Sequence, residues 1–305
     1  MNELRREGVV VKGLGGLYEV VLDGGERVAA RGRGILRRDE KQKLLIGDRV
    51  TVLSSEGAEP VIESIHPRRC ALIRPPMSNV DAIYAVIAAA RPAPALETLD
   101  KLLAIAEHNA IRAALVISKQ DCDPAAAAHY AGIYRKVGIP VFCISSQTGE
   151  GIEALSEDVQ GQLTGGRITA FAGASGVGKS TLLNRLFPQL SLETGEISRR
   201  IERGKHTTRH VELFEMESGG FLADTPGFSL LDFAHFDFFE LDDLFSAFRE
   251  FAPHLGKCRY ADCTHTGESA RECAIAQAVL DGEIPESRHE SYRALWRTLK
   301  DKTRY

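Results

Sequence analysis

GASGVGKS occupies residues 173–180 and fits the phosphate-binding pattern G-x-x-x-x-G-K-S. An apolar strand pattern over 168–173 precedes it, and a helical pattern over 179–186 follows it. In this setting glycines let backbone N–H groups turn inward around phosphate oxygens, and the helix N-terminus adds a positive dipole. Lys179 is predicted to neutralise the β- and γ-phosphates, and Ser180 to bind Mg²⁺. The predicted phosphate contacts are Gly173, Ala174, Ser175, Gly176, Val177, Gly178, Lys179, Ser180 and Thr181.

Strand and helix patterns alternate on both sides of this loop. We predict strands over 82–88, 113–118, 140–145, 168–173, 211–217 and 221–224. Between them, Leu96, Leu99, Leu103 and Ala106 share a helical face, and further helices are predicted over 124–137, 152–163 and 179–186. The alternation predicts a doubly wound, mostly parallel sheet.

The two ends of the chain differ from this middle part. Short alternating stretches separated by glycines, at 8–12, 17–22, 27–31 and 49–53, predict a small antiparallel barrel. Beyond residue 233, phenylalanines occur in an acidic, helix-like stretch, followed by cysteines and a histidine and by a basic helix over 286–305. We therefore predict three domains, over 1–68, 69–232 and 233–305.

Composition limits the classes of protein. A chain of 305 residues is long enough for two or three domains. Its net charge of −4 means that the molecule as a whole is not a polycation, so any contact with nucleic acid must come from local basic surface. The longest apolar run, 82–90, is too short to span a bilayer, and no secretory signal is visible. Six cysteines without such a signal argue against a disulfide scaffold. We expect a cytoplasmic protein without a membrane partner.

The nucleotide is indicated by two loops that each follow a predicted strand. The first is Ser118, Lys119, Gln120 and Asp121. An aspartate can accept hydrogen bonds from guanine N1–H and the exocyclic amine, whereas adenine offers the opposite pattern. Lys119 is expected over the base plane. The second loop, 145–151, begins with Ser145 and Ser146, whose backbone and hydroxyls are expected to hold the base edge.

Two further segments complete a nucleotide-hydrolysing site. Asp224 follows an apolar strand and suits a water-mediated Mg²⁺ contact, while Gly227 can donate its N–H to the γ-phosphate. Thr207 is the preferred Mg²⁺ ligand of the upstream segment, although the sequence does not separate it from Thr208. Common small GTPases orient the attacking water with a glutamine after Asp-x-x-Gly, but Phe228 stands there. Hydrolysis by the isolated protein should therefore be slow, and His206 is the internal candidate to place the water.

The C-terminal cysteines and histidine predict a metal site. Cys258, Cys263, His265 and Cys273 have the ligand types of a Cys₃His zinc centre. Four protein ligands imply a closed, structural site. Its zinc would contribute folding energy directly.

The order of the motifs resembles the circularly permuted GTPases, specifically the small ribosomal subunit biogenesis GTPase family (RsgA/YjeQ). Ordinary GTPases start with the phosphate loop and end with the guanine loop, whereas here the guanine loop comes first. The resemblance implies an OB-type barrel, a permuted G domain and a helical zinc domain. It also implies GTP hydrolysis coupled to late maturation of the small (30S) ribosomal subunit, and it supports His206 as the catalytic histidine.

Two departures from the family pattern affect these expectations. Ser118 stands where the family usually has asparagine. Because serine is shorter, we expect it not to reach as far to the base or the phosphate loop, and nucleotide affinity to be weaker. The family also has a shorter gap before its last metal-binding cysteine than the one before Cys273.

Three basic stretches indicate a large RNA partner engaged through phosphates. They lie in 31–43, in 199–209 and in 288–305, the last of which also contains Tyr292, Trp296 and Tyr305. The expected partners are the 30S subunit and its 16S rRNA, bound by a monomer. Because 224–228 leads directly into the third domain, we expect nucleotide state to be transmitted through that connection.

Two other classes compete with this interpretation. A P-loop ATPase or small-molecule kinase is disfavoured by Asp121 and by the lack of an obvious acceptor-binding lid. A non-enzymatic RNA-binding adaptor is disfavoured by intact Lys179, Ser180 and Asp224.

Overall fold

A computed structural model describes residues 4–32, 43–55, 57–73, 75–190, 211–224 and 240–302, with only the backbone of Asp224 and Lys302. The chain forms two compact units. One comprises Met1–Asp81, Val159–Ala170 and Glu196–Phe228, and the other comprises Ala82–Asp158, Phe171–Gly195 and Ser229–Tyr305. The domain boundaries after residues 68 and 232 stay predictions.

The N-terminal strands close into a barrel, as predicted. Its strands are β1 (Leu4–Leu14), β2 (Leu17–Leu22), β3 (Arg27–Gly32), β4 (Arg49–Ser54) and β5 (Val61–Ile65). They follow the order β1-β2-β3-β5-β4 around the barrel, and β4 returns to β1. Fully buried Val10, Val20, Val50 and Ile62 fill the interior.

Two features of the barrel correct the prediction. Strand β5 was not predicted, and it pairs in parallel with β3, so the barrel is not wholly antiparallel. The short sequence of β5, VIESI, carries too little alternation to be recognised alone. The pairing is decided by closure, because an unpaired edge at β3 would leave backbone groups without partners.

The predicted six-stranded sheet is present. Its strands are β8 (Val80–Ala88), β9 (Arg112–Ser118), β10 (Val141–Cys143), β11 (Ile168–Gly173), β12 (Glu212–Glu215) and β13 (Phe221–Asp224), in the order β10-β9-β8-β11-β13-β12. Strands β10, β9 and β8 run parallel, as do β11 and β13, whereas β12 runs antiparallel to β13. Strands buried on both faces read as continuous apolar runs, as β8 and β11 do. A small hairpin of β6 (Ala71–Leu72) and β7 (Met77–Ser78) was not predicted.

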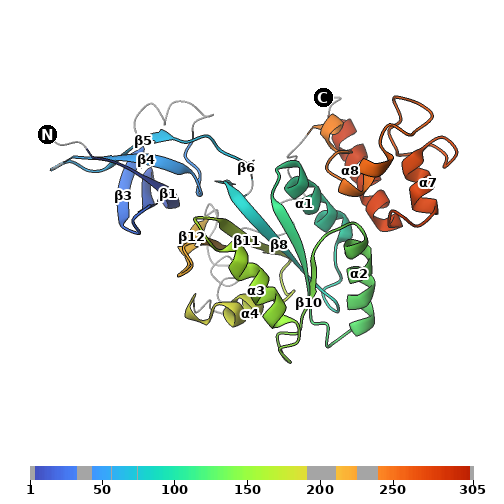
Figure 1. Cartoon of the computed structure of the whole chain (residues 1–305), viewed down its shortest axis with the longest axis horizontal. Coiled ribbons are helices and arrows are strands. Elements are labelled where there is room, and N and C mark those ends of the chain that lie inside the picture. The colour runs from blue at the N-terminus through green and yellow to red at the C-terminus, as the bar shows by residue number, and fades with distance from the viewer. Residues whose placement is uncertain are drawn as a thin grey trace. The chain divides into compact units, whose positions relative to one another are not determined.

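Helices cover both faces of this sheet. In Figure 1, α1 (Leu96–His108) and α2 (Pro124–Lys136) lie on one side, and α3 (Ile152–Gln162) and α4 (Lys179–Leu186) on the other. A short 3₁₀ turn, η2 (Pro188–Leu190), follows α4. Helix α2 begins where sequence signals place it, because the Asp123 side chain accepts the Ala126 N–H and Pro124 occupies the first turn.

The C-terminal part packs on α1. It contains η3 (Leu241–Asp243), η4 (Arg249–His254), α7 (Ala274–Leu280) and α8 (Glu286–Lys302). Helix α8 lies against α1, which explains why every residue of 99–106 is buried although the sequence predicted one apolar face. No described helix is long and apolar enough to cross a membrane.

The prediction that the phenylalanine-rich stretch is helical was wrong for its described part. In the described part, 240–254, the backbone forms short 3₁₀ turns instead of an α-helix. Pro253 lacks the N–H that a continuing helix needs. Phe248 and Phe251 are nevertheless fully buried, and their rings contact Tyr292 of α8. Phe248 and Phe251 therefore belong to a small core beneath α8.

Candidate functional site

The phosphate loop lies between β11 and α4, as predicted. Gly176 and Gly178 have φ angles of +80° and +92°, which side chains disfavour, and Gly178 caps the N-terminus of α4. A Cβ at Gly173 would lie 2.8 Å from the carbonyl of Val86. Lys179 and Ser180 occupy the first turn of α4, half-buried. The loop has the backbone shape and helix terminus that bind phosphate.

Ser118 ties the next loop to the phosphate loop. Its side chain is buried, with 2% exposed, and its Oγ lies 2.5 Å from the carbonyl oxygen of Val177 and 3.0 Å from that of Ile87. Since one hydroxyl carries one proton, the two carbonyls share it. The expectation that serine is too short to reach the phosphate loop was therefore wrong, because the backbones approach closely enough here.

Lys119 makes a second connection between these loops. Its backbone has a φ of +57°, and its Nζ donates to the carbonyls of Gly176 and Arg91, both at 2.7 Å. The N–H of Gln120 donates to Ile144 at the end of β10. Lys119 and Gln120 thus connect the ends of β9, β10 and β11.

Asp121 and Ser145 orient the two base-reading loops. The exposed carboxylate of Asp121 accepts a hydrogen bond from the Ser145 hydroxyl, which lowers the pKa of Asp121. The buried Ser145 Oγ in turn accepts the N–H groups of Gln147 and Thr148, at 3.2 and 3.1 Å. The hydrogen bond thus favours the ionised, acceptor-only form of the exposed Asp121 carboxylate, the form that guanine recognition requires.

Arg185 is a site residue that sequence reasoning missed. It projects from α4, and its guanidinium donates to the Ser146 carbonyl at 2.6 Å. A Cβ on Gly149 would lie 2.7 Å from the same group and would displace it, and the φ of +91° at this position itself favours glycine. The contact fastens the base-edge loop to the phosphate-loop helix. A basic residue late in a helix gives no local signal of such a contact.

Several predicted site residues lie outside the described part of the chain. His206, Thr207, Thr208, Gly227 and Phe228 are among them. Asp224 ends β13, where only its backbone is described. Their predicted roles stay predictions.

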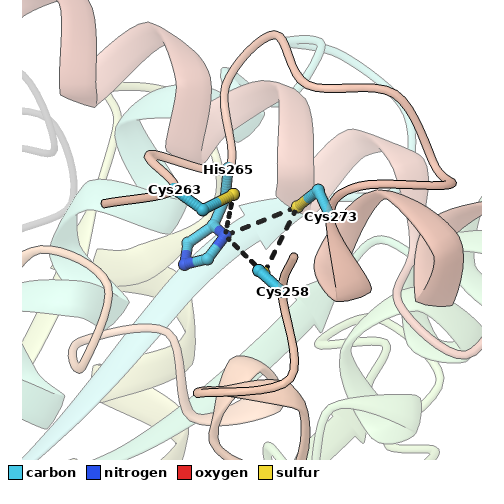
Figure 2. A group of neighbouring side chains, drawn as sticks. All are labelled: Cys258, Cys263, His265 and Cys273. Carbon is cyan, nitrogen blue, oxygen red and sulfur yellow. Dashed lines mark hydrogen bonds between the residues drawn. The ribbon is translucent and has the colours of Figure 1, made fainter. Parts of the chain in front are cut away.

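The four predicted metal ligands come together in the C-terminal part. Figure 2 shows Cys258, Cys263, His265 and Cys273 directed toward one centre, with their ligand atoms within 4.8 Å of one another. The His265 Nδ1 lies 3.5, 3.3 and 3.4 Å from the three sulfurs, and the sulfurs of Cys258 and Cys273 are 4.0 Å apart. Tetrahedral zinc bonds give edges of about 3.6 Å for S–N and about 3.8 Å for S–S. The cluster is compatible with zinc, and Cys273 belongs to it despite its spacing.

Burial sets the protonation of these ligands. It raises the pKa of the Cys263 and Cys273 thiols and lowers the pKa of the His265 imidazole. The imidazole is thus neutral and able to ligate, whereas a metal must displace thiol protons.

A second set of contacts holds the metal-binding loop in place. The His289 Nε2 lies 2.7 Å from the His265 carbonyl, and the Tyr292 hydroxyl donates to Thr264 at 2.9 Å. The Glu268 carboxylate accepts the N–H groups of Thr264 and Thr266, both at 2.9 Å. Burial opposes ionisation of Glu268, but hydrogen bonds from the N–H groups of Gly267, Thr264 and Glu268 itself and from the Thr264 hydroxyl outweigh it and lower its pKa to about 2.

The basic helix only partly matches the predicted RNA surface. Arg288 is 2% exposed and pairs with Asp100 of α1 and with Glu250, both at 2.7 Å. Tyr292 is also buried. Arg297 is exposed, and Lys300 lies 4.3 Å from the Trp296 ring centre. Arg288 therefore fastens α8 to α1 and cannot face a nucleic acid.

These features define a class of protein. A phosphate loop is joined by Ser118 and Lys119 to a carboxylate-bearing loop that precedes it in the chain. The same chain also contains an N-terminal barrel and a Cys₃His cluster. This is the arrangement of a P-loop, guanine-nucleotide-binding protein with rotated motif order. The chain belongs to the RsgA GTPase family, since family profiles described as RsgA N-terminal domain and RsgA GTPase match residues 7–62 and 65–234.

Known proteins are similar to this chain along nearly its full length. A "Small ribosomal subunit biogenesis GTPase RsgA" of Alkaliphilus metalliredigens is 39% identical, over 98% of this chain and 99% of the relative. One of Gemmatimonas aurantiaca is 41% identical, over 93% and 94%. The crystal structure of YjeQ from Thermotoga maritima has a TM-score of 0.79 at 34% identity, covering 97% and 99%. That of YloQ, titled a circularly permuted GTPase, has a TM-score of 0.75 at 33% identity, covering 98% and 96%.

Proposed function

We propose that this chain hydrolyses GTP to GDP and phosphate on the small (30S) ribosomal subunit during its late maturation. The observation that carries the proposal is the pair of hydrogen bonds from Ser118 and Lys119 to the phosphate-loop carbonyls of Val177 and Gly176. They hold a base-reading loop and a phosphate loop as one pocket. Relatives named as small ribosomal subunit biogenesis GTPases support the subunit as partner, with action in the cytoplasm.

Two metals belong to this function. Ser180, at the start of the phosphate-loop helix, together with Thr207 and Asp224, would hold Mg²⁺. When bound, Mg²⁺ supplies positive charge to the β- and γ-phosphate oxygens. The second metal is one structural Zn²⁺ at the Cys₃His cluster, whose distances fit it.

His206 is proposed to orient the attacking water, because Phe228 has no group that can do so. We expect His206→Ala to lose subunit-stimulated hydrolysis while keeping its GDP affinity, since the histidine belongs to neither the base loops nor the phosphate loop. Single-turnover GTP hydrolysis and GDP titration measure the two quantities. Unchanged stimulated turnover would remove His206 from the mechanism.

Turnover of GTP with and without purified 30S subunits tests the function itself. We expect stimulation of the wild-type protein and its loss in Lys179→Ala, because that variant lacks the phosphate-neutralising ammonium. Equal turnover with and without subunits would reject a ribosome-stimulated GTPase. ATP displacing bound GDP as well as GTP does would reject the guanine assignment.

The proposal extends to the oligomeric state of the protein and to its contacts with rRNA. We infer a monomer that contacts 16S rRNA through phosphates, including contacts from exposed Arg297 on α8. Binding should then weaken steeply as salt rises.

A further inference from the structure

The base-edge loop, 145–151, is held by internal hydrogen bonds that leave one of its backbone donors unused. Within the loop, N–H groups donate to the carbonyls of Ser145 and Glu150, to the Ser145 Oγ and to the Thr148 Oγ1. These donors are the N–H groups of Ser145, Gln147, Thr148, Gly149 and Glu150. Among residues 145–150, the Ser146 N–H is thus the donor without an acceptor in the described part of the chain.

Guanine offers an acceptor that needs such a donor. Its O6 atom accepts hydrogen bonds, and the N1–H and the exocyclic amine beside it donate them. An ionised Asp121 can accept from both donors but has no proton to give to O6. Asp121 also accepts the hydroxyl of Ser145, the residue before Ser146, so the unused N–H follows directly on the residue that contacts the carboxylate. The Ser146 N–H therefore suits O6.

Arg185 holds the other side of Ser146. Its Nη1 donates to the Ser146 carbonyl at 2.6 Å, a short distance typical of a charge-assisted hydrogen bond. This carbonyl shares a planar peptide unit with the N–H of Gln147, which donates to the Ser145 Oγ. The preceding peptide unit is held by the Gly149 N–H, which donates to the Ser145 carbonyl at 2.9 Å. Both peptide units that flank Ser146 are therefore anchored, and Arg185 supplies the anchor from outside the loop.

The position of Arg185 on α4 has a simpler explanation to compare. An arginine in the last turn of a helix is favourable because it lies near the negative end of the helix dipole. That explanation requires no contact with Ser146. It predicts that removing the charge changes stability or overall affinity, but not which base is bound.

We propose that Arg185 is a positioning residue for guanine recognition, which holds the Ser146 carbonyl so that the Ser146 N–H donates to O6 of the base. Arg185 acts through Ser146 and needs no contact of its own with the base. The inference rests on the proposed function and deepens it, because it names a residue of the phosphate-loop helix that contributes to base selection.

Nucleotides altered at O6 test the proposal. In 6-thio-GDP a sulfur replaces O6 and accepts hydrogen bonds weakly, while the N1–H and the amine remain. We expect the full-length wild-type protein to prefer GDP over 6-thio-GDP. Arg185→Met should reduce that preference by about two- to tenfold, the range of one hydrogen bond. Competition against a ribose-labelled fluorescent GDP measures both affinities.

A second nucleotide separates positioning from a general effect. IDP keeps O6 but lacks the amine that Asp121 accepts from, so the preference for GDP over IDP should be the same in wild type and Arg185→Met. Loss of a positive charge alone would weaken all three nucleotides equally and leave both preferences unchanged, which would overturn the proposal. An equal fall in both preferences would show that the whole base pocket has loosened, and it would also overturn the proposal.

Arg135 provides a matched control in the same compact unit. It is also an exposed arginine late in a helix, and its guanidinium donates to a backbone carbonyl, that of Val141 at 3.3 Å. Val141 begins β10, whereas the base-edge loop follows the end of that strand. Arg135→Met should therefore leave the preference for GDP over 6-thio-GDP at the wild-type value. An equal loss in Arg135→Met and Arg185→Met would contradict the assignment.

Competition by ADP distinguishes a failure of this inference from a failure of the proposed function. If ADP displaces the labelled GDP from wild type as well as GDP does, the guanine assignment fails whatever the variants show. If wild type rejects ADP but Arg185→Met keeps the full preference for GDP over 6-thio-GDP, only the role of Arg185 fails. If wild type rejects ADP but binds GDP and 6-thio-GDP equally, O6 is not read by a donor and the inference is again overturned.

Discussion

At the scale of residues, Ser118 contacts the phosphate loop although its side chain is shorter than the asparagine usual in the family. Its hydroxyl is buried between the Val177 and Ile87 carbonyls, so loop position replaces side-chain length. One of the contacts that hold the pocket together, that of Ser118, is therefore inaccessible to water. The expected loss of nucleotide affinity stays a prediction, whereas the geometry shows that Ser118 does reach the phosphate loop.

Removing this hydroxyl should loosen the pocket. We expect Ser118→Ala to lower the free energy of unfolding by about 1–3 kcal/mol and to weaken GDP binding, because two buried carbonyls lose their shared donor. Ser118→Thr retains a hydroxyl and serves as the control. Urea unfolding and GDP titration measure both effects, and a Ser118→Ala variant identical to wild type in both would contradict the role.

A second prediction at this scale is that zinc affinity depends on pH. Burial raises the pKa of the Cys263 and Cys273 thiols, so protons compete with the metal more strongly as pH falls. Apparent zinc affinity should drop by up to about tenfold per pH unit for each thiol that must lose a proton.

Competition with a chromophoric chelator between about pH 8 and about pH 6 measures this slope. Cys273→Ser should lower the affinity and flatten the slope. Cys122→Ser, which changes an exposed cysteine outside the cluster, should change neither. A slope of zero in wild type would contradict binding through thiolates.

At the scale of elements, α8 is fastened to α1 by a buried arginine. The Arg288 guanidinium pairs with Asp100 and Glu250, and it lies 4.6 Å from the Phe248 ring centre. The Tyr134 hydroxyl of α2 also donates to Asp100, at 2.9 Å. One ion-pair network therefore joins α1, α2, η4 and α8.

Breaking the ion-pair network should destabilise the folded protein. We expect Arg288→Met to lower the free energy of unfolding by about 3–5 kcal/mol, because Asp100 and Glu250 would be left as buried, unpaired carboxylates. The matched control is Arg249→Met, whose ion pair with Glu107 is partly exposed and should matter by at most about 1 kcal/mol. Equal losses in chemical unfolding would contradict this reading.

At the scale of the whole molecule, the predicted transmission of nucleotide state through 224–228 stays a prediction, because that segment beyond the Asp224 backbone lies outside the described residues. The described contacts attach the C-terminal region to α1 and α2. Arg249 also donates to the Gly138 carbonyl, and Lys136 donates to Gly282. The region and these helices should behave as one body.

Spin labels test this expectation. With labels at exposed His129→Cys on α2 and Glu290→Cys on α8, in a background lacking Cys122, the distance should be the same with GDP and a GTP analogue. The buried ion pairs resist relative motion. A second pair within α8, at Glu290→Cys and Arg297→Cys, calibrates the distribution, and a nucleotide-dependent shift in the first pair alone would contradict the prediction.

The sequence by itself determined the features that are local in the chain. The phosphate loop, its flanking strand and helix, and the types of metal ligand are each encoded within a short segment, so pattern and composition suffice. Tertiary structure alone decided the contacts between distant segments. Ser118 reaches Val177, Arg185 reaches Ser146, and β5 completes the barrel beside β3. The sequence cannot show whether the Arg288 guanidinium is solvated or paired, because its chemistry is the same in both cases. Packing of α8 against α1 pairs it with Asp100.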